Sequence, residues 1–69
     1  MVIKGKYRHF KGGEYELLYI AKHSETGEEM VVYRALYGAG EVWVRPVKMW
    51  EEMVKKDGKS IPRFLKIED

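Results

Sequence analysis

Apolar and polar side chains alternate along much of this chain in short runs, and small turn sequences separate the runs. Such alternation places every second side chain on the same face of a β-strand. Runs rich in Val, Ile, Tyr and Trp predict strands over residues 6–10, 14–23, 28–37, 41–47 and 60–67. The turn sequences between runs are Gly12-Gly13, Ser24-Glu25-Thr26-Gly27, Gly38-Ala39-Gly40 and Asp57-Gly58. The pattern therefore predicts a mainly β fold.

The turn at residues 24–27 has the sequence of a β-hairpin connection. Ser24-Glu25-Thr26 suits a type I turn, and Gly27 suits the left-handed residue that follows it. Pro46 lies near the end of the fourth predicted strand, and Pro62 marks the last strand as an edge strand because proline lacks a backbone N–H.

Residues 48–54 do not show the alternation of a strand. Met49, Trp50, Met53 and Val54 recur at helical spacing, which predicts a short helix that must dock on the sheet to be stable. Together these elements predict a single small SH3-like barrel over residues 1–69, with about five short strands and a helical turn before the last strand.

The alternation does not show which face of the second predicted strand points to the core, but it favours one face of the fourth. In the second strand both alternating sets are substantially apolar: one is Tyr15, Leu17, Tyr19 and Ala21, the other Glu16, Leu18, Ile20 and Lys22. In the fourth strand, alternation favours Val42 and Val44 as core and leaves Trp43 and Arg45 at a rim or in a functional site.

Composition narrows the possible environments of the protein. The 69 residues suffice for one domain, and the absence of cysteine excludes disulfides, thiolate metal sites and cysteine nucleophiles. A cysteine-free small domain without a signal-peptide pattern or a membrane-length apolar run predicts a cytoplasmic protein with no membrane partner. The net charge of +2 gives little global attraction to nucleic acid. A domain this small buries only roughly 60% of its unfolded surface, which favours stabilisation by self-association.

Signatures of catalysis are sparse. The chain has no phosphate-binding glycine loop, zinc-protease motif or nucleophile elbow, so we expect no cofactor and lean against an enzyme. The two histidines, with a carboxylate, leave one alternative: a small metal-assisted hydrolase using His9, His23 and Glu25. The competing interpretation of His23 to Thr26 is local, with side chains that hydrogen-bond the turn backbone.

All four arginines of the chain lie close in sequence to an aromatic residue. Arg8, Arg34, Arg45 and Arg63 each lie one or two positions from a ring. If these arginines converge on one face, they would form an anion or nucleotide site, because guanidinium groups bind phosphate or carboxylate and stack on rings. If they do not, each arginine pairs with a glutamate and packs within the domain. The segment from Tyr7 to Lys11 alternates cations and rings and could stack bases in the same way.

Several of these segments together resemble a known family. The segments are Tyr7-Arg8-His9-Phe10-Lys11-Gly12, His23-Ser24-Glu25-Thr26, Val32-Tyr33-Arg34, Leu36-Tyr37-Gly38, Trp43-Val44-Arg45-Pro46 and Pro62-Arg63-Phe64. Their order and spacing resemble a bacterial family of small domains, domain of unknown function number 1653. The resemblance implies no activity, but it implies a shared surface built from Arg8, His9, Lys11, His23, Glu25, Arg34, Trp43, Arg45 and Arg63. It also implies a docked ring at Trp50.

These observations rank three functions. The leading hypothesis is a non-catalytic binding module with an arginine and aromatic surface for an anionic ligand: a nucleotide, a nucleic-acid segment or an acidic peptide. The second is a protein-interaction or homo-oligomerisation domain, since aromatic residues anchor interfaces. The third is the small metal-assisted hydrolase.

Overall fold

The structure is a computed structural model that describes residues 2–68. Its elements are β1 (Gly5–His9), β2 (Glu14–Lys22), β3 (Glu29–Ala35), β4 (Val42–Pro46), α1 (Val47–Trp50), β5 (Met53–Lys56), β6 (Lys59–Pro62) and β7 (Phe64–Glu68). The predicted mainly β class is confirmed. The strands form a five-stranded antiparallel sheet in the order β4-β3-β2-β1-β7 and a separate β5–β6 hairpin.

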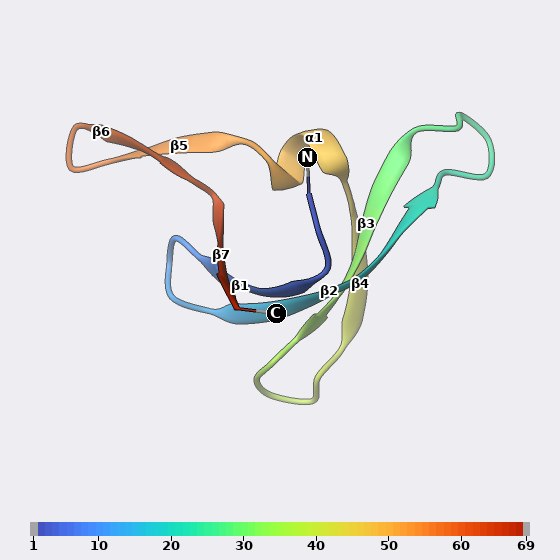
Figure 1. Cartoon of the computed structure of the whole chain (residues 1–69), viewed down its shortest axis with the longest axis horizontal. Coiled ribbons are helices and arrows are strands. Elements are labelled where there is room, and N and C mark those ends of the chain that lie inside the picture. The colour runs from blue at the N-terminus through green and yellow to red at the C-terminus, as the bar shows by residue number, and fades with distance from the viewer. Residues whose placement is uncertain (1, 69) are drawn as a thin grey trace.

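The main sheet is strongly curved, and α1 lies over its concave side (Figure 1). Trp50 of α1 is 1% exposed and stacks face to face on Phe64 of β7, with ring centroids 3.8 Å apart. The other fully or nearly buried core side chains are Tyr7, Leu17, Val31 and Tyr33. The expected docking of the Trp50 ring is thus confirmed, and α1 closes one part of the concave face.

A β-bulge explains why both faces of the second strand look apolar. Leu17 pairs with Tyr33, but Tyr19 pairs with Val32, so Leu18 is an extra residue in β2. The extra residue moves the following side chains to the opposite face. Consequently Leu17 before the bulge and Ile20 after it both lie on the side of the sheet that holds Val31 and Tyr33.

The predicted turn after β2 is confirmed. Gly27 has a φ of +78°, and its N–H donates to the carbonyl of His23. A side chain at this position would be strained, because L-residues disfavour positive φ.

The C-terminal third differs from the sequence-based prediction. The helix ends at Trp50 instead of Val54, and Met53 and Val54 belong to β5. The predicted last strand is divided at Arg63 into β6 and β7. Asp57 and Gly58 both have positive φ, as in a two-residue type I′ turn, and this turn reverses the chain into a hairpin.

The expectation that Val42 and Val44 belong to the core is wrong. These side chains are 48% and 61% exposed. Trp43 pairs with Tyr33 and Arg45 with Val31, so Trp43 and Arg45 occupy the concave side. Because β4 is an edge strand, its inner face lies at the rim. Within residues 2–68, no helix has the length and apolar character needed to cross a membrane.

Candidate functional site

The concave side of the sheet beside α1 holds a cavity of about 610 Å³. We call it the aromatic cup, and its lining residues are His9, Tyr15, Tyr33, Trp43, Val44, Arg45, Pro46, Met49 and Phe64. They come from β1, β2, β3, β4, α1 and β7, so the cup exists only when the whole sheet is assembled. Its volume lies within the roughly 300–1,000 Å³ typical of small-ligand sites.

Aromatic rings form most of the wall of the cup. Tyr15 meets Tyr33 and Phe64 edge to face, with centroids 5.5 and 5.7 Å apart. Trp43 meets Tyr33 in the same way at 6.1 Å and remains 41% exposed. Trp43 therefore offers ring surface to a ligand, whereas the buried rings hold the wall in place.

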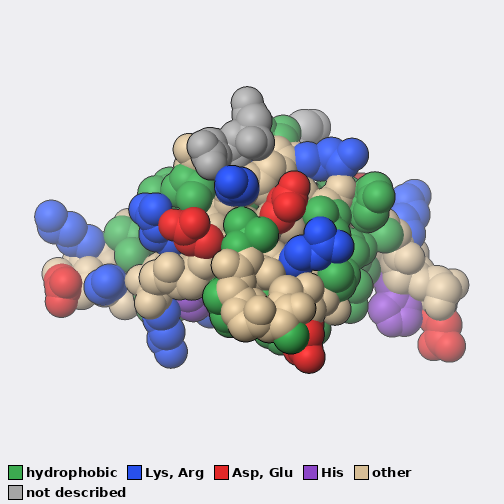
Figure 2. All heavy atoms as spheres, turned by 90° about the horizontal axis from the view of Figure 1, so that it is seen from below, with side chains coloured by type: hydrophobic (Ala, Val, Ile, Leu, Met, Phe, Trp, Pro, Cys, Tyr) green, Lys and Arg blue, Asp and Glu red, His purple; other side chains and the backbone are tan. Residues whose placement is uncertain are grey.

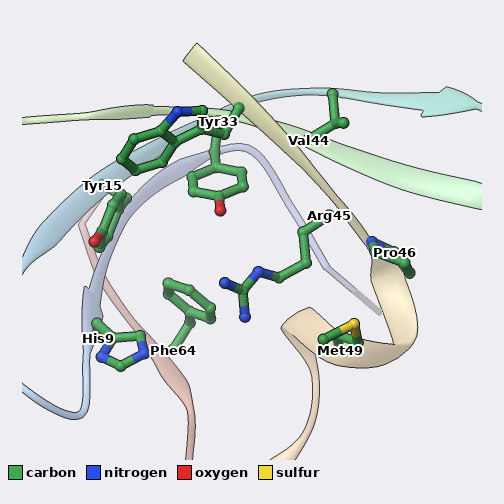
Figure 3. A pocket seen from close by; sticks show the side chains of 9 residues that line it. His9, Tyr15, Tyr33, Val44, Arg45, Pro46, Met49 and Phe64 are labelled. Carbon is green, nitrogen blue, oxygen red and sulfur yellow. The ribbon is translucent and has the colours of Figure 1, made fainter. Parts of the chain in front are cut away.

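Arg45 projects into the cup from β4. Its guanidinium reaches the space beside Tyr33 and Phe64 (Figure 3) and lies 5.6 Å from the centroid of the Phe64 ring. In the part of the chain that the structure describes, no carboxylate forms an ion pair with Arg45, and its guanidinium donates no hydrogen bond. The donors of this guanidinium are therefore available to an anion.

His9 forms the opposite wall. Its Nδ1 accepts a hydrogen bond from the Lys11 backbone N–H at 3.1 Å, and its ring packs edge to face on Phe64, with centroids 4.9 Å apart. Burial lowers the pKa of His9 below its usual 6.5, and the charges of Arg63, Arg45 and Lys11 lower it further. His9 is thus neutral at pH 7, and because Nδ1 is an acceptor, the ring proton is on Nε2.

Tyr15 adds no charge to the cup. Burial and a hydrogen bond with the Tyr37 hydroxyl raise the pKa of Tyr15 to about 12. Among the described residues, no carboxylate lines the cup. At neutral pH the cup therefore carries one positive charge, on Arg45, inside an aromatic wall.

The other arginines do not share this site. Arg8 Nη2 lies 2.9 Å from Glu14 Oε2, and Arg63 Nη2 lies 2.9 Å from Glu52 Oε1. Arg34 pairs across the sheet with Glu16, on the face opposite Tyr33. The four arginines therefore do not converge on one surface, and two of them make the glutamate pairs that the sequence left as an alternative.

His23 and Glu25 lie at the far end of β2. The Nδ1 of His23 accepts from the backbone N–H of Glu25 at 3.1 Å, as expected for a local turn. His9 hydrogen-bonds Gly13, and from Gly13 to His23 the extended chain spans about 30 Å at ~3.3 Å per residue. His9, His23 and Glu25 therefore cannot share one metal ion, and the side chains that the structure describes include no group of three or more His, Asp or Glu placed to hold one.

Of the nine residues predicted from the sequence, three line the cup: His9, Trp43 and Arg45. Lys11 and Arg63 are close enough to affect the pKa of His9. Tyr15, Tyr33 and Phe64 were not predicted as site residues, because an isolated ring in a strand has the same sequence pattern as a core ring. Only the pairing of residues across neighbouring strands identifies two of them as site residues, since Tyr33 is paired with Trp43 and Phe64 with His9.

Comparison with known proteins agrees with the motif pattern. The family model described as "Protein of unknown function (DUF1653)" matches residues 5–66. A crystal structure of a DUF1653 protein from Bordetella bronchiseptica superposes with a TM-score of 0.87 at 35% sequence identity, covering 96% of this chain and 87% of that one. No curated protein matches the chain. The chain belongs to the DUF1653 family.

Proposed function

We propose that this domain is a non-catalytic binding module whose aromatic cup takes an anionic ligand with a planar group. The carrying observation is the Arg45 guanidinium, which points into the cup without a carboxylate partner among the described residues. A phosphate or carboxylate would accept charge-assisted hydrogen bonds from Arg45. A planar ring would stack on the exposed surface of Trp43.

The charge of the cup selects against cationic ligands. Aromatic cages that hold quaternary ammonium groups use ring faces to attract the cation. Here Arg45 would repel it, and no lining carboxylate compensates. A nucleotide matches both features of the cup, since it joins a flat base to a phosphate.

The proposal excludes an acid–base role for His9. Its Nδ1 is occupied by the Lys11 N–H, and the cup lining has no carboxylate to form an acid–base pair with it. The Nε2–H of His9 serves instead as a second donor to the ligand. A cytoplasmic address remains part of the proposal, supported by the cysteine-free sequence.

The test is calorimetric titration of the protein with adenosine monophosphate, together with amide chemical shifts. We expect shifts at Trp43 and Arg45, and a loss of about tenfold or more in affinity for Arg45→Gln, because a hydrogen bond to a charged group contributes about 1.5–3 kcal/mol. Arg34→Gln is the matched control, since it removes the same charge from the opposite face. Equal losses in the two variants, or shifts confined to other surfaces, would contradict the proposal.

A second candidate is homodimerisation through the outer face of the sheet. Tyr19, Val32 and Val44 lie side by side across β2, β3 and β4 on that face. Tyr19 and Val44 are each 61% exposed. A second copy of this chain is the occupant that suits the patch, because a domain of this size gains stability by burying additional apolar surface.

A further inference from the structure

The β5–β6 hairpin brings a cation to the turn after β1, next in sequence to His9 of the aromatic cup. Lys56 Nζ lies 3.5 Å from the carbonyl oxygen of Phe10, in the turn after β1. The ring of Phe10 also has Lys11 Nζ at 5.7 Å and the Arg63 guanidinium at 6.0 Å from its centroid. Lys11 and Arg63 thus lie against the Phe10 ring, and Lys56 lies against the backbone carbonyl of the same residue.

A fourth cation lies on the hairpin directly opposite Lys56. Lys56 and Lys59 form a cross-strand pair that flanks the Asp57-Gly58 turn. Like charges in this position destabilise a hairpin. We define the basic collar as Lys11, Lys56, Lys59 and Arg63. Among the side chains that the structure describes, no carboxylate forms an ion pair with its three lysines.

The collar is continuous with the cup. His9 lines the cup and also a second, apolar hollow of about 260 Å³ that Phe10, Ile61 and Pro62 help to form. Arg45 of the cup and Lys11 and Arg63 of the collar all act on His9 electrostatically. Figure 2 shows several Lys and Arg side chains at the end of the molecule where Figure 1 places the β5–β6 hairpin.

The combination of features favours one class of ligand. A cationic track beside an aromatic cavity fits a chain that alternates negative charges with flat rings, as single-stranded nucleic acid does. An acidic peptide has the charges but no ring beside each charge. In a duplex the bases are stacked and paired, so a base would have to leave the stack to enter a concave cup.

We propose that the cup and the collar together bind single-stranded nucleic acid, with one base against Trp43, the phosphate of that nucleotide on Arg45 and the following phosphates on Lys11, Lys56 and Lys59. This inference rests on the proposed function of the cup and extends it. It assigns the unpaired lysines of the hairpin to phosphate binding. It also implies that affinity increases with the length of the strand until the collar is filled.

The test compares thymidine monophosphate with an oligothymidylate of about six nucleotides. We expect the oligonucleotide to bind at least about tenfold more tightly than the monophosphate. In a plot of log binding constant against log salt concentration, its slope should be steeper by ~0.7 for each added phosphate contact. The double variant Lys56→Gln/Lys59→Gln should remove most of this gain and leave the affinity for thymidine monophosphate unchanged. It should also fold more stably than the wild type, since it relieves the like-charge pair.

The matched control is Lys4→Gln/Lys22→Gln, which lowers the net charge equally but lies outside the collar. It should retain oligonucleotide affinity. If the oligonucleotide binds no more tightly than the monophosphate, or if both double variants weaken it equally, the inference is wrong and the cup proposal stands. Tighter binding of polyglutamate than of the oligonucleotide would also overturn it. If neither thymidine ligand binds in an Arg45-dependent manner, the cup proposal itself fails.

Discussion

Arg45 differs from Arg8 and Arg63 because no carboxylate among the described residues forms an ion pair with it. Arg8 and Arg63 lie 2.9 Å from glutamate oxygens, whereas Arg45 lies against the Phe64 ring. All four arginines look alike in the sequence, where each is next to an aromatic residue. Which of them finds a carboxylate depends on strand register and on the connection between α1 and β5 that carries Glu52. These are properties of the assembled fold, so residue spacing did not reveal the free guanidinium.

His9 is the titratable residue that reports on the charge of the cup. We expect Arg45→Gln to raise the pKa of His9, because burial and three cations now hold this pKa below 6.5 and the variant removes one cation. NMR titration of the two histidine rings measures it directly. His23, in the remote turn, serves as the internal reference. A pKa for His9 that does not move would contradict the placement of Arg45 in the cup.

The same group links stability to pH. In the unfolded chain His9 binds its proton more readily than in the folded domain, since its folded pKa is lowered. The free energy of unfolding should therefore decrease as the pH falls from about 6.5 toward the lowered value. Thermal unfolding of the wild type and of His9→Gln across this range should give a flatter pH profile for the variant.

At the scale of elements, the turns and the first four strands followed from the sequence, and the C-terminal elements did not. Alternation and glycine placement are local signals, and they identified β1 to β4 to within one or two residues. Met49, Trp50, Met53 and Val54 satisfy helical spacing, and nothing in that spacing separates Met53 and Val54 from the helix. The type I′ turn at Asp57-Gly58 decides in favour of a hairpin, and this outweighs the helical spacing.

The short helix α1 acts mainly through Trp50. We expect Trp50→Ala to lose about 3–5 kcal/mol of stability, because it empties the space against Phe64 and Tyr7. Trp50→Phe should lose less than about 1.5 kcal/mol. It keeps a ring on Phe64 and removes an indole N–H that is buried without a hydrogen-bond partner in the described residues.

Urea denaturation measures both Trp50 variants. Equal losses for Trp50→Phe and Trp50→Ala would show that the indole N–H has a partner important to the folded state, contrary to the structure. If Trp50→Ala does not fold at all, Trp50→Phe still tests the argument.

At the scale of the whole molecule, charge is separated along the long axis. The domain measures 38 Å in its longest dimension, and its two protruding hairpins lie toward opposite ends (Figure 1). The β5–β6 hairpin carries Lys55, Lys56 and Lys59, while the β2–β3 hairpin carries Glu25, Glu28 and Glu29. The net charge of +2 hides this separation, because composition sums charges without regard to position.

Self-association belongs to this scale as well. If the outer apolar face is a dimer interface, Tyr19→Lys should shift the protein to a monomer in sedimentation equilibrium. Leu36→Lys, which adds the same charge at an exposed turn position, should leave the dimer intact. A wild-type protein that remains monomeric at the highest soluble concentration would contradict the dimer.

The chain has two tryptophans in opposite environments, and this gives the molecule two intrinsic optical probes. Trp50 is enclosed by rings, while Trp43 is exposed at the mouth of the cup. A soluble quencher such as acrylamide should therefore reach the fluorescence of Trp43 and spare that of Trp50. A ligand in the cup should protect Trp43 from the quencher, and unfolding should expose Trp50 to it. One emission spectrum can thus separate ligand binding from loss of the fold without any added label.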